Sequence, residues 1–404
     1  MCASRYLLLF FVLFPLVLWV FSFDDFSPFK NIASLYFPET VTTKELKEKY
    51  ARSQLNVLIV PGHDNNSYGT EFKGLKEAEL NIILGTHLLN FFLKDPKFNV
   101  SILRDIDGEY SMWFQEYMTT HKQKVIDFRD LSKRLISDAK QMGHFVESNA
   151  PVEHNPAADN VSLNLYGINK YANDFGIDIV LHLHFNDYPG RPWTQQGKYS
   201  GFSIYVPEGE LPNSQASTEL AYSIKNHLEE FIASSNFFGE SEVVIPDQEL
   251  IAVGSNASRN KISILLEYDY IYEAQYHTDE LRDVVLKELA LLTYQGVKNY
   301  YKESTEQKTS ILPYTWTKDI KKLDRSIDVL ALQTALRKEG LYPPKEKTLS
   351  DCPINGYYGS CTEESVKTFQ EKYSGIIIAP FGLSTGTGNF GKNTREHLTN
   401  LYGK

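Results

Sequence analysis

The stretch Val57-Leu58-Ile59-Val60-Pro61-Gly62-His63-Asp64 joins a short apolar run to a turn and a histidine. Two later stretches have the same form: residues 177–183 lead into His184-Phe185-Asn186, and residues 262–266 lead into Glu267. Buried strands of α/β proteins read as continuous apolar runs, and ligands bind where the carboxyl ends of such strands open into a crevice. Each run ends in a residue that can ligate a metal or carry a proton, so the three strand ends predict one site at one edge of a sheet.

Strand-like runs alternate with helical patterns between residues 55 and 301, which is typical of a mainly parallel sheet covered by helices. The expected strands are 56–60, 99–103, 177–184, 202–206, 243–246 and 262–267. The expected helices are 77–93, 163–175, 214–234 and 278–302. We therefore predict an α/β fold with a mainly parallel twisted sheet flanked by helices, followed by a small three-helix C-terminal domain.

Composition limits the kinds of partner. The chain has 404 residues, is 42% hydrophobic and carries a net charge of -10 at pH 7. At roughly 150 residues per domain, this length predicts two or three domains. The negative charge argues against nucleic acid as a partner.

The first residues predict membrane targeting. Residues 6–23 are nearly all apolar, which is about the lower length limit for a membrane-spanning helix. Arg5 precedes this run and Asp24 and Asp25 follow it, so the charges favour an N-terminus inside and an exported remainder. No small-x-small cleavage pattern ends the run, so we favour a retained anchor over a cleaved signal peptide. Residues 24–54 are expected to be a spacer with one short helix.

Cys352 and Cys361 lie close in sequence. In an exported chain such a pair usually forms a disulfide. The alternative is two reduced, buried thiols, and two cysteines alone make a poor structural zinc site.

Residues 109–150 exceed what a minimal domain of this class needs. They contain one expected long helix, 122–144, and no strand. A lid or autoinhibitory role, and with it a regulatory protein partner, stays open beside the simpler interpretation of a plain surface helix.

The segment Gly74-Leu75-Lys76-Glu77-Ala78-Glu79-Leu80-Asn81 begins a helix just after the first strand. The helical spacing of the apolar residues that follow marks one inward face. Glu77 falls on that face and Glu79 falls well off it, so Glu77 is the better candidate for the site. The alternative for Glu77 is a first-turn acid that interacts with the helix dipole.

Two histidines, His182 and His184, lie on the same side of one expected strand, because side chains repeat every two residues. From spacing alone, either of them could ligate a metal.

The C-terminal part has a different pattern. Residues 303–323 read as a linker, and residues 324–404 contain three expected helices. The turn G-x-(F/Y)-G-x-x-T occurs twice, in 356–362 and 388–394, each time before a helix. We expect the glycines to make the turn and the threonines to cap the helices.

The P-G-H turn, the E-x-x-L-N helix start, the H-F-N strand end and the late glutamate together resemble the zinc-dependent N-acetylmuramoyl-L-alanine amidases of bacterial cell walls. The resemblance implies one zinc ion per chain, held by His63, Glu77 and His184, with Glu267 as the catalytic acid–base. It favours His184 over His182, which stands where the family usually has serine. Asn186 could hold Glu267 or one of the ligands in place. His182 could do the same, but the simpler interpretation is a hydrogen-bonded histidine of the core.

The segment 324–404, with its L-Q and F-Q helices, resembles a small peptidoglycan-binding domain. Together with the apolar run at residues 6–23, the resemblances imply an exported, membrane-anchored enzyme of the cell envelope. It would hydrolyse the amide between N-acetylmuramic acid and L-alanine in peptidoglycan, with residues 55–302 as the catalytic domain. A zinc peptidase acting on stem peptides and a non-catalytic peptidoglycan-binding scaffold remain the alternatives.

Overall fold

The computed structural model describes residues 42–143, 157–254, 262–301 and 310–403. The expected N-terminal anchor, residues 1–23, lies outside the described residues. None of the helices within these ranges combines the length and the hydrophobicity that a membrane crossing requires.

A six-stranded sheet forms the centre of the larger part, in the order β4-β1-β5-β8-β6-β7. Strands β4, β1, β5 and β8 are mutually parallel, and β6, which is parallel to β7, runs antiparallel to β8. The bounds are β1 Leu55–Pro61, β4 Phe98–Ile102, β5 Ile179–Asn186, β6 Ser203–Pro207, β7 Val244–Asp247 and β8 Ile262–Tyr270, with a separate hairpin of β2 Glu71–Phe72 and β3 Leu75–Lys76. The predicted fold class, a mainly parallel sheet flanked by helices, is confirmed.

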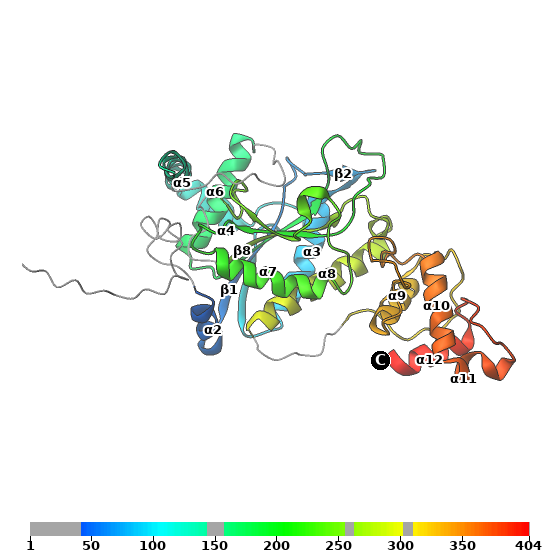
Figure 1. Ribbon diagram of the computed structural model, residues 1–404. Helices are drawn as coiled ribbons and strands as arrows, with labels where there is room; N and C mark the ends of the chain where they lie inside the picture. Colours follow the sequence, from blue (N-terminus) through cyan, green and yellow to red (C-terminus); the bar gives the residue numbers. More distant parts are fainter. Residues whose placement is uncertain (1–41, 144–156, 255–261, 302–309, 404) are drawn as a thin grey trace, which may run out of the picture.

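Helices cover both faces of this sheet (Figure 1). They are α2 Thr43–Arg52, α3 Glu77–Phe92, α4 Met112–Thr120, α5 Lys122–Gln141, α6 Asp159–Asp174, α7 Ser214–Leu228 and α8 Asp279–Tyr301, with short 3-10 turns η2 Phe238–Glu240 and η3 Ala274–Tyr276. Alternate residues of β1 point into two separate hydrophobic cores, one on each face of the sheet. Val57 and Ile59 face a core that includes residues of α3, α7 and α8, whereas Leu58 and Val60 face α4, α5 and α6. The expected helix 214–234 was too long, because α7 ends at Leu228.

Helix α2 lies in the segment that was expected to be a spacer. Its Leu46 and Tyr50 are buried, and Lys49 pairs with Asp178 at 2.7 Å. Thr42 and Glu45 form a capping box at its start. The helix therefore packs against the sheet rather than extending away from it.

The extra segment after β4 contains two helices, not the one expected. Phe114 and Tyr117 of α4 and Val125 of α5 are buried in the core shared with α6. The Tyr117 hydroxyl donates to Asp174 at 2.7 Å. The described part of this segment is therefore packed into the core, so the interpretation as a plain surface helix does not hold. These contacts leave the lid or autoinhibitory role untested.

The C-terminal part is helical: α9 Ile327–Lys338, α10 Ser360–Lys372, α11 Ser374–Ile377, η4 Ala379–Phe381 and α12 Lys392–Tyr402. The disulfide Cys352–Cys361 is present. Residues of the expected linker pack onto this part, because Leu312, Tyr314 and Trp316 are buried.

The two repeated turns are held by glutamines. Gln333 of α9 accepts from the Gly356 N–H at 2.9 Å and donates to the Thr362 hydroxyl at 3.0 Å. Gln370 of α10 repeats this with Gly388 at 3.0 Å and Thr394 at 2.9 Å. The prediction that these threonines cap the helices is wrong, since the N-caps are Gly359 and Gly391 and each threonine is the third residue of its helix.

Candidate metal and catalytic site

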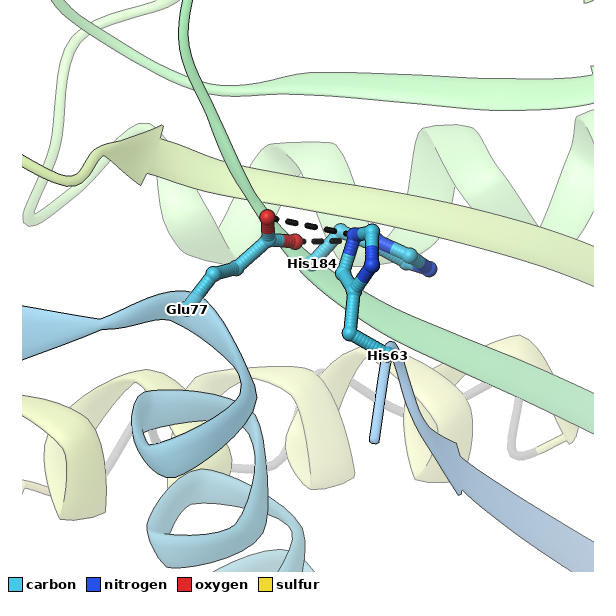
Figure 2. Close-up of side chains that lie close together, drawn as sticks. All are labelled: His63, Glu77 and His184. Carbon is cyan, nitrogen blue, oxygen red and sulfur yellow. Dashed lines mark hydrogen bonds and ion pairs between the residues drawn. The ribbon is translucent and has the colours of Figure 1, made fainter. Parts of the chain in front are cut away.

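His63, Glu77 and His184 come together at the carboxyl ends of β1 and β5 (Figure 2). One ligand atom from each lies within 4.8 Å of the others. Glu77 Oε2 lies 3.2 Å from His63 Nε2, and Glu77 Oε1 lies 3.0 Å from His184 Nδ1. The structure therefore brings together the three residues that the resemblance selected.

The loop after β1 places the His63 side chain beside Glu77 and His184. Its backbone has a φ of +62°, in the left-handed region, where histidine is among the few non-glycine residues found repeatedly. The carboxylate of Asp64 then accepts the N–H groups of Asn66 and Ser67, both at 2.8 Å. These bonds fix the turn that directly follows His63.

Two glycines leave room for the ligand side chains. A Cβ on Gly62 would lie 2.3 Å from the His184 ring. A Cβ on Gly69, whose φ is +76°, would lie 2.3 Å from Glu77 Oε2 and 2.6 Å from the His63 ring. Neither glycine can take a side chain without moving a member of the cluster.

This crowding gives a first prediction. Gly69→Ala should displace Glu77 or His63, and, if the cluster binds zinc, the zinc content of the purified variant should fall to a small fraction of that of wild type. Gly74→Ala is the matched control: its φ is also positive, at +89°, but no atom lies within 4 Å of the added Cβ. Both variants carry backbone strain of about 1–2 kcal/mol, so equal zinc content in the two would show that crowding at Gly69 is unimportant.

Glu77 is buried at the first position of α3. Its carboxylate also accepts the backbone N–H groups of Thr70 at 3.0 Å and Phe185 at 3.2 Å. Burial alone would raise the pKa of Glu77, but the two flanking histidines hold it well below its ordinary value. In turn Glu77 outweighs burial at His63 and raises the pKa of that ring.

His182 is not part of the cluster. It is buried on β5 beside Val60 and Leu265. Burial and the nearby His184 lower the pKa of His182 to about 3, so its ring is neutral. Its Nε2 has no hydrogen-bond partner among the described residues. The choice of His184 over His182 therefore agrees with the geometry.

Glu267 is the register partner of His184 across the β5–β8 pair. Paired residues of neighbouring strands share a face, so this carboxylate stands beside the histidine cluster. Its Oε2 has no partner among the described residues. Burial, with Glu77 and Glu240 nearby, raises the pKa of Glu267 well above its ordinary value, and a cation in the cluster would lower it again.

Asn186 was expected to hold Glu267 or a ligand, but within the described residues its side chain hydrogen-bonds to neither Glu267 nor the three clustered residues. Its side chain donates to Glu240 at 2.6 Å, and Glu240 also accepts the Tyr205 hydroxyl at 3.0 Å. The strand is irregular between His184 and Asn186, which turns Asn186 toward this neighbour. The sequence analysis did not single out Glu240, because this residue lies in the short 3-10 turn η2 and does not follow an apolar run.

The three donors fit a divalent metal of the zinc type. Two imidazole nitrogens and one carboxylate oxygen are ligands that catalytic zinc takes, with the fourth position left to water. Their ligand atoms lie within 4.8 Å of one another, whereas donors of one tetrahedral zinc ion lie roughly 3.5 Å apart, so binding an ion would draw the three side chains closer together. Gly62 and Gly69, which leave room for these side chains, also favour a metal-binding site here.

Solved structures similar to this chain are N-acetylmuramoyl-L-alanine amidases. The one from Clostridium difficile 630 is 17% identical, with a TM-score of 0.38 over 61% of this chain and 97% of that chain. The CwlD amidase from Clostridioides difficile, in complex with the GerS lipoprotein, is 16% identical, with a TM-score of 0.42 over 62% and 100%. The apo form of Ami1 from Mycobacterium abscessus is 13% identical, with a TM-score of 0.40 over 61% and 99%.

Residues 325–375 match the family model of the peptidoglycan binding domain. At these identities the similarity to the amidases is one of fold alone, and the family match is confined to residues 325–375. The amidase structures and the family match agree with the two resemblances indicated by the sequence motifs, and neither of them bears on zinc. No curated protein sequence matches the chain.

Proposed function

We propose that this protein is an exported zinc-dependent N-acetylmuramoyl-L-alanine amidase. One zinc ion would be held by His63, Glu77 and His184. The observation that carries the proposal is the convergence of these three donors within 4.8 Å of one another, with Glu267 beside them in register.

The residues of this chain divide the chemistry between them. Zinc in such a site polarises the substrate carbonyl and lowers the pKa of its water. Glu267 takes the proton of the attacking water and delivers it to the leaving L-alanine amine. The hydrogen bonds from Thr70 and Phe185 keep the Glu77 carboxylate fixed during this cycle. His182, neutral and enclosed, contributes packing behind the site.

Product analysis of digested peptidoglycan tests the proposal. The amidase should release stem peptides with a free L-alanine amino terminus and leave glycan strands without peptides. A zinc peptidase using the same site would instead release fragments cut within the stem peptide. A binding scaffold would release neither product, and either of these results would contradict the proposal.

We further propose that the C-terminal part holds the enzyme on the wall. The domain family matched by residues 325–375 is named for peptidoglycan binding. The chain has no net positive charge that could attract anionic wall polymers, so affinity must come from a specific site. The N-terminal segment would add membrane anchoring at the outer face of the membrane.

Removing this part should separate wall binding from chemistry. A piece spanning residues 310–404, which keeps the buried Leu312, Tyr314 and Trp316, should sediment with insoluble peptidoglycan. A chain ending near residue 309 should still cleave small soluble muropeptides but digest intact wall more slowly, because tethering raises the effective substrate concentration. Unchanged wall digestion without residues 310–404 would contradict the targeting role.

A further inference from the structure

Arg191 lies in the loop after β5, and its side chain is only 1% exposed. Its Nε and Nη2 donate to the two carboxylate oxygens of Asp187 at 2.6 and 2.7 Å. Its remaining bonds go to the carbonyls of Glu71 at 2.7 Å, Pro192 at 3.0 Å and Gln195 at 2.9 Å. A guanidinium has five N–H donors, so each of them has a partner. Such complete pairing fixes the loop in one arrangement.

Asp187 also hydrogen-bonds to the loop between β1 and β2. Its Oδ2 accepts the hydroxyl of Thr70 at 2.5 Å. Thr70 in turn exchanges two hydrogen bonds with Glu77: its N–H donates to Glu77 Oε2, and its carbonyl accepts the Glu77 N–H, both at 3.0 Å. A continuous chain of bonds thus runs from the buried arginine to the carboxylate of the candidate metal site.

We propose that Arg191, Asp187 and Thr70 form a positioning clamp that fixes the Glu77 carboxylate for metal binding. The inference rests on the proposed function, in which Glu77 is a zinc ligand. Groups that orient metal ligands from behind typically change metal affinity by 10–100-fold when they are removed. No sequence motif pointed to these three residues.

The geometry explains why the clamp is needed. Glu77 is the first residue of α3, and Lys76 before it makes no side-chain cap. The connection from His63 to Thr70 consists of turns, with no strand or helix of its own. Thr70 is the residue that ties this connection to both the Asp187 loop and Glu77. Without the Thr70 hydroxyl, the bond to Asp187 is lost, and the Thr70 N–H that orients Glu77 Oε2 is held less firmly in place.

The test uses the full chain and two substitutions at one position. Thr70→Val keeps the shape and removes the hydroxyl, whereas Thr70→Ser keeps the hydroxyl. Thr119→Val is the matched control, because the Thr119 hydroxyl also makes one hydrogen bond, to the Gln115 carbonyl at 2.8 Å on α4. The zinc dissociation constant is measured by competition with a chromogenic chelator, and the melting temperature is measured on metal-free protein.

We expect Thr70→Val to bind zinc ~10–100-fold more weakly than wild type, with the melting temperature of the metal-free protein unchanged. Thr70→Ser and Thr119→Val should bind zinc as wild type does. Asp187→Asn, which leaves Arg191 without its ionic partner, should weaken zinc binding in the same direction as Thr70→Val.

Wild-type zinc affinity in Thr70→Val, or a lower melting temperature with unchanged affinity, would overturn the clamp while leaving the proposed function intact. Absence of stoichiometric zinc from the wild-type protein would overturn the metal site itself, and the clamp with it. The two failures are therefore distinguishable in one set of titrations.

Discussion

Replacing His63 or His184 with alanine should remove zinc from the purified protein. Each histidine faces one oxygen of Glu77, at 3.2 and 3.0 Å, so each substitution leaves only two protein donors. Catalytic zinc sites are built on three protein ligands, and the remaining pair should not retain the ion through gel filtration. We expect about one zinc per chain in wild type and close to none in either variant, as measured by elemental analysis.

Two other histidines serve as controls. His87 pairs with Asp283 at 2.8 Å, away from the cluster, so His87→Ala should keep its zinc. His182→Ala also should keep most of it, because the His182 ring lies in the core beside Val60 and Leu265. Full zinc occupancy in both His63→Ala and His184→Ala would rule out the site. Loss of zinc in His182→Ala alone would mean that the other histidine of β5 is the ligand.

The second large effect is expected at Glu267. Glu267→Gln keeps the shape of the side chain and removes its basic oxygen. Zinc content should stay at the wild-type level, because Glu267 is not among the three clustered donors. Turnover of a soluble muropeptide should fall by ~10²–10⁴-fold, the range typical of lost acid–base catalysis.

Glu79→Gln is a matched control for this change, because Glu79 is an exposed glutamate two residues from Glu77. It should leave turnover unchanged. Near-normal hydrolysis by Glu267→Gln would mean that another group accepts the proton. Asp269 is the nearest alternative on the same strand, but its carboxylate already accepts the N–H groups of Gly201 and Tyr270 and the Gln275 amide.

Much of the sheet could be predicted because its strands are buried on both faces. The apolar runs before His63, His184 and Glu267 became β1, β5 and β8. The order of the strands could not be predicted, since an apolar run does not specify which strand lies beside it. Helix α4 was missed because its buried residues, Phe114 and Tyr117, are aromatic and favour strands as much as helices.

The three donors could be predicted and their surroundings could not. Strand ends and one helix face indicated His63, Glu77 and the pair His182 and His184, and the family resemblance chose His184 from that pair. Arg191 and Thr70 lie in loops, where no periodicity relates residues that are far apart in sequence. Their contact depends on the folded path of two loops, which only the structure reveals. The same holds for Asn186, whose partner Glu240 lies 54 residues later.

The most direct test of the account follows the zinc dependence of one bond cleavage. Wild-type protein is freed of metal with a chelator, then assayed on a soluble N-acetylmuramoyl peptide with and without one equivalent of zinc, and new amino termini are identified by mass spectrometry. The account predicts that only the zinc-loaded protein cleaves, and that the new terminus is L-alanine. Cleavage by metal-free protein, or a new terminus elsewhere in the peptide, would contradict it.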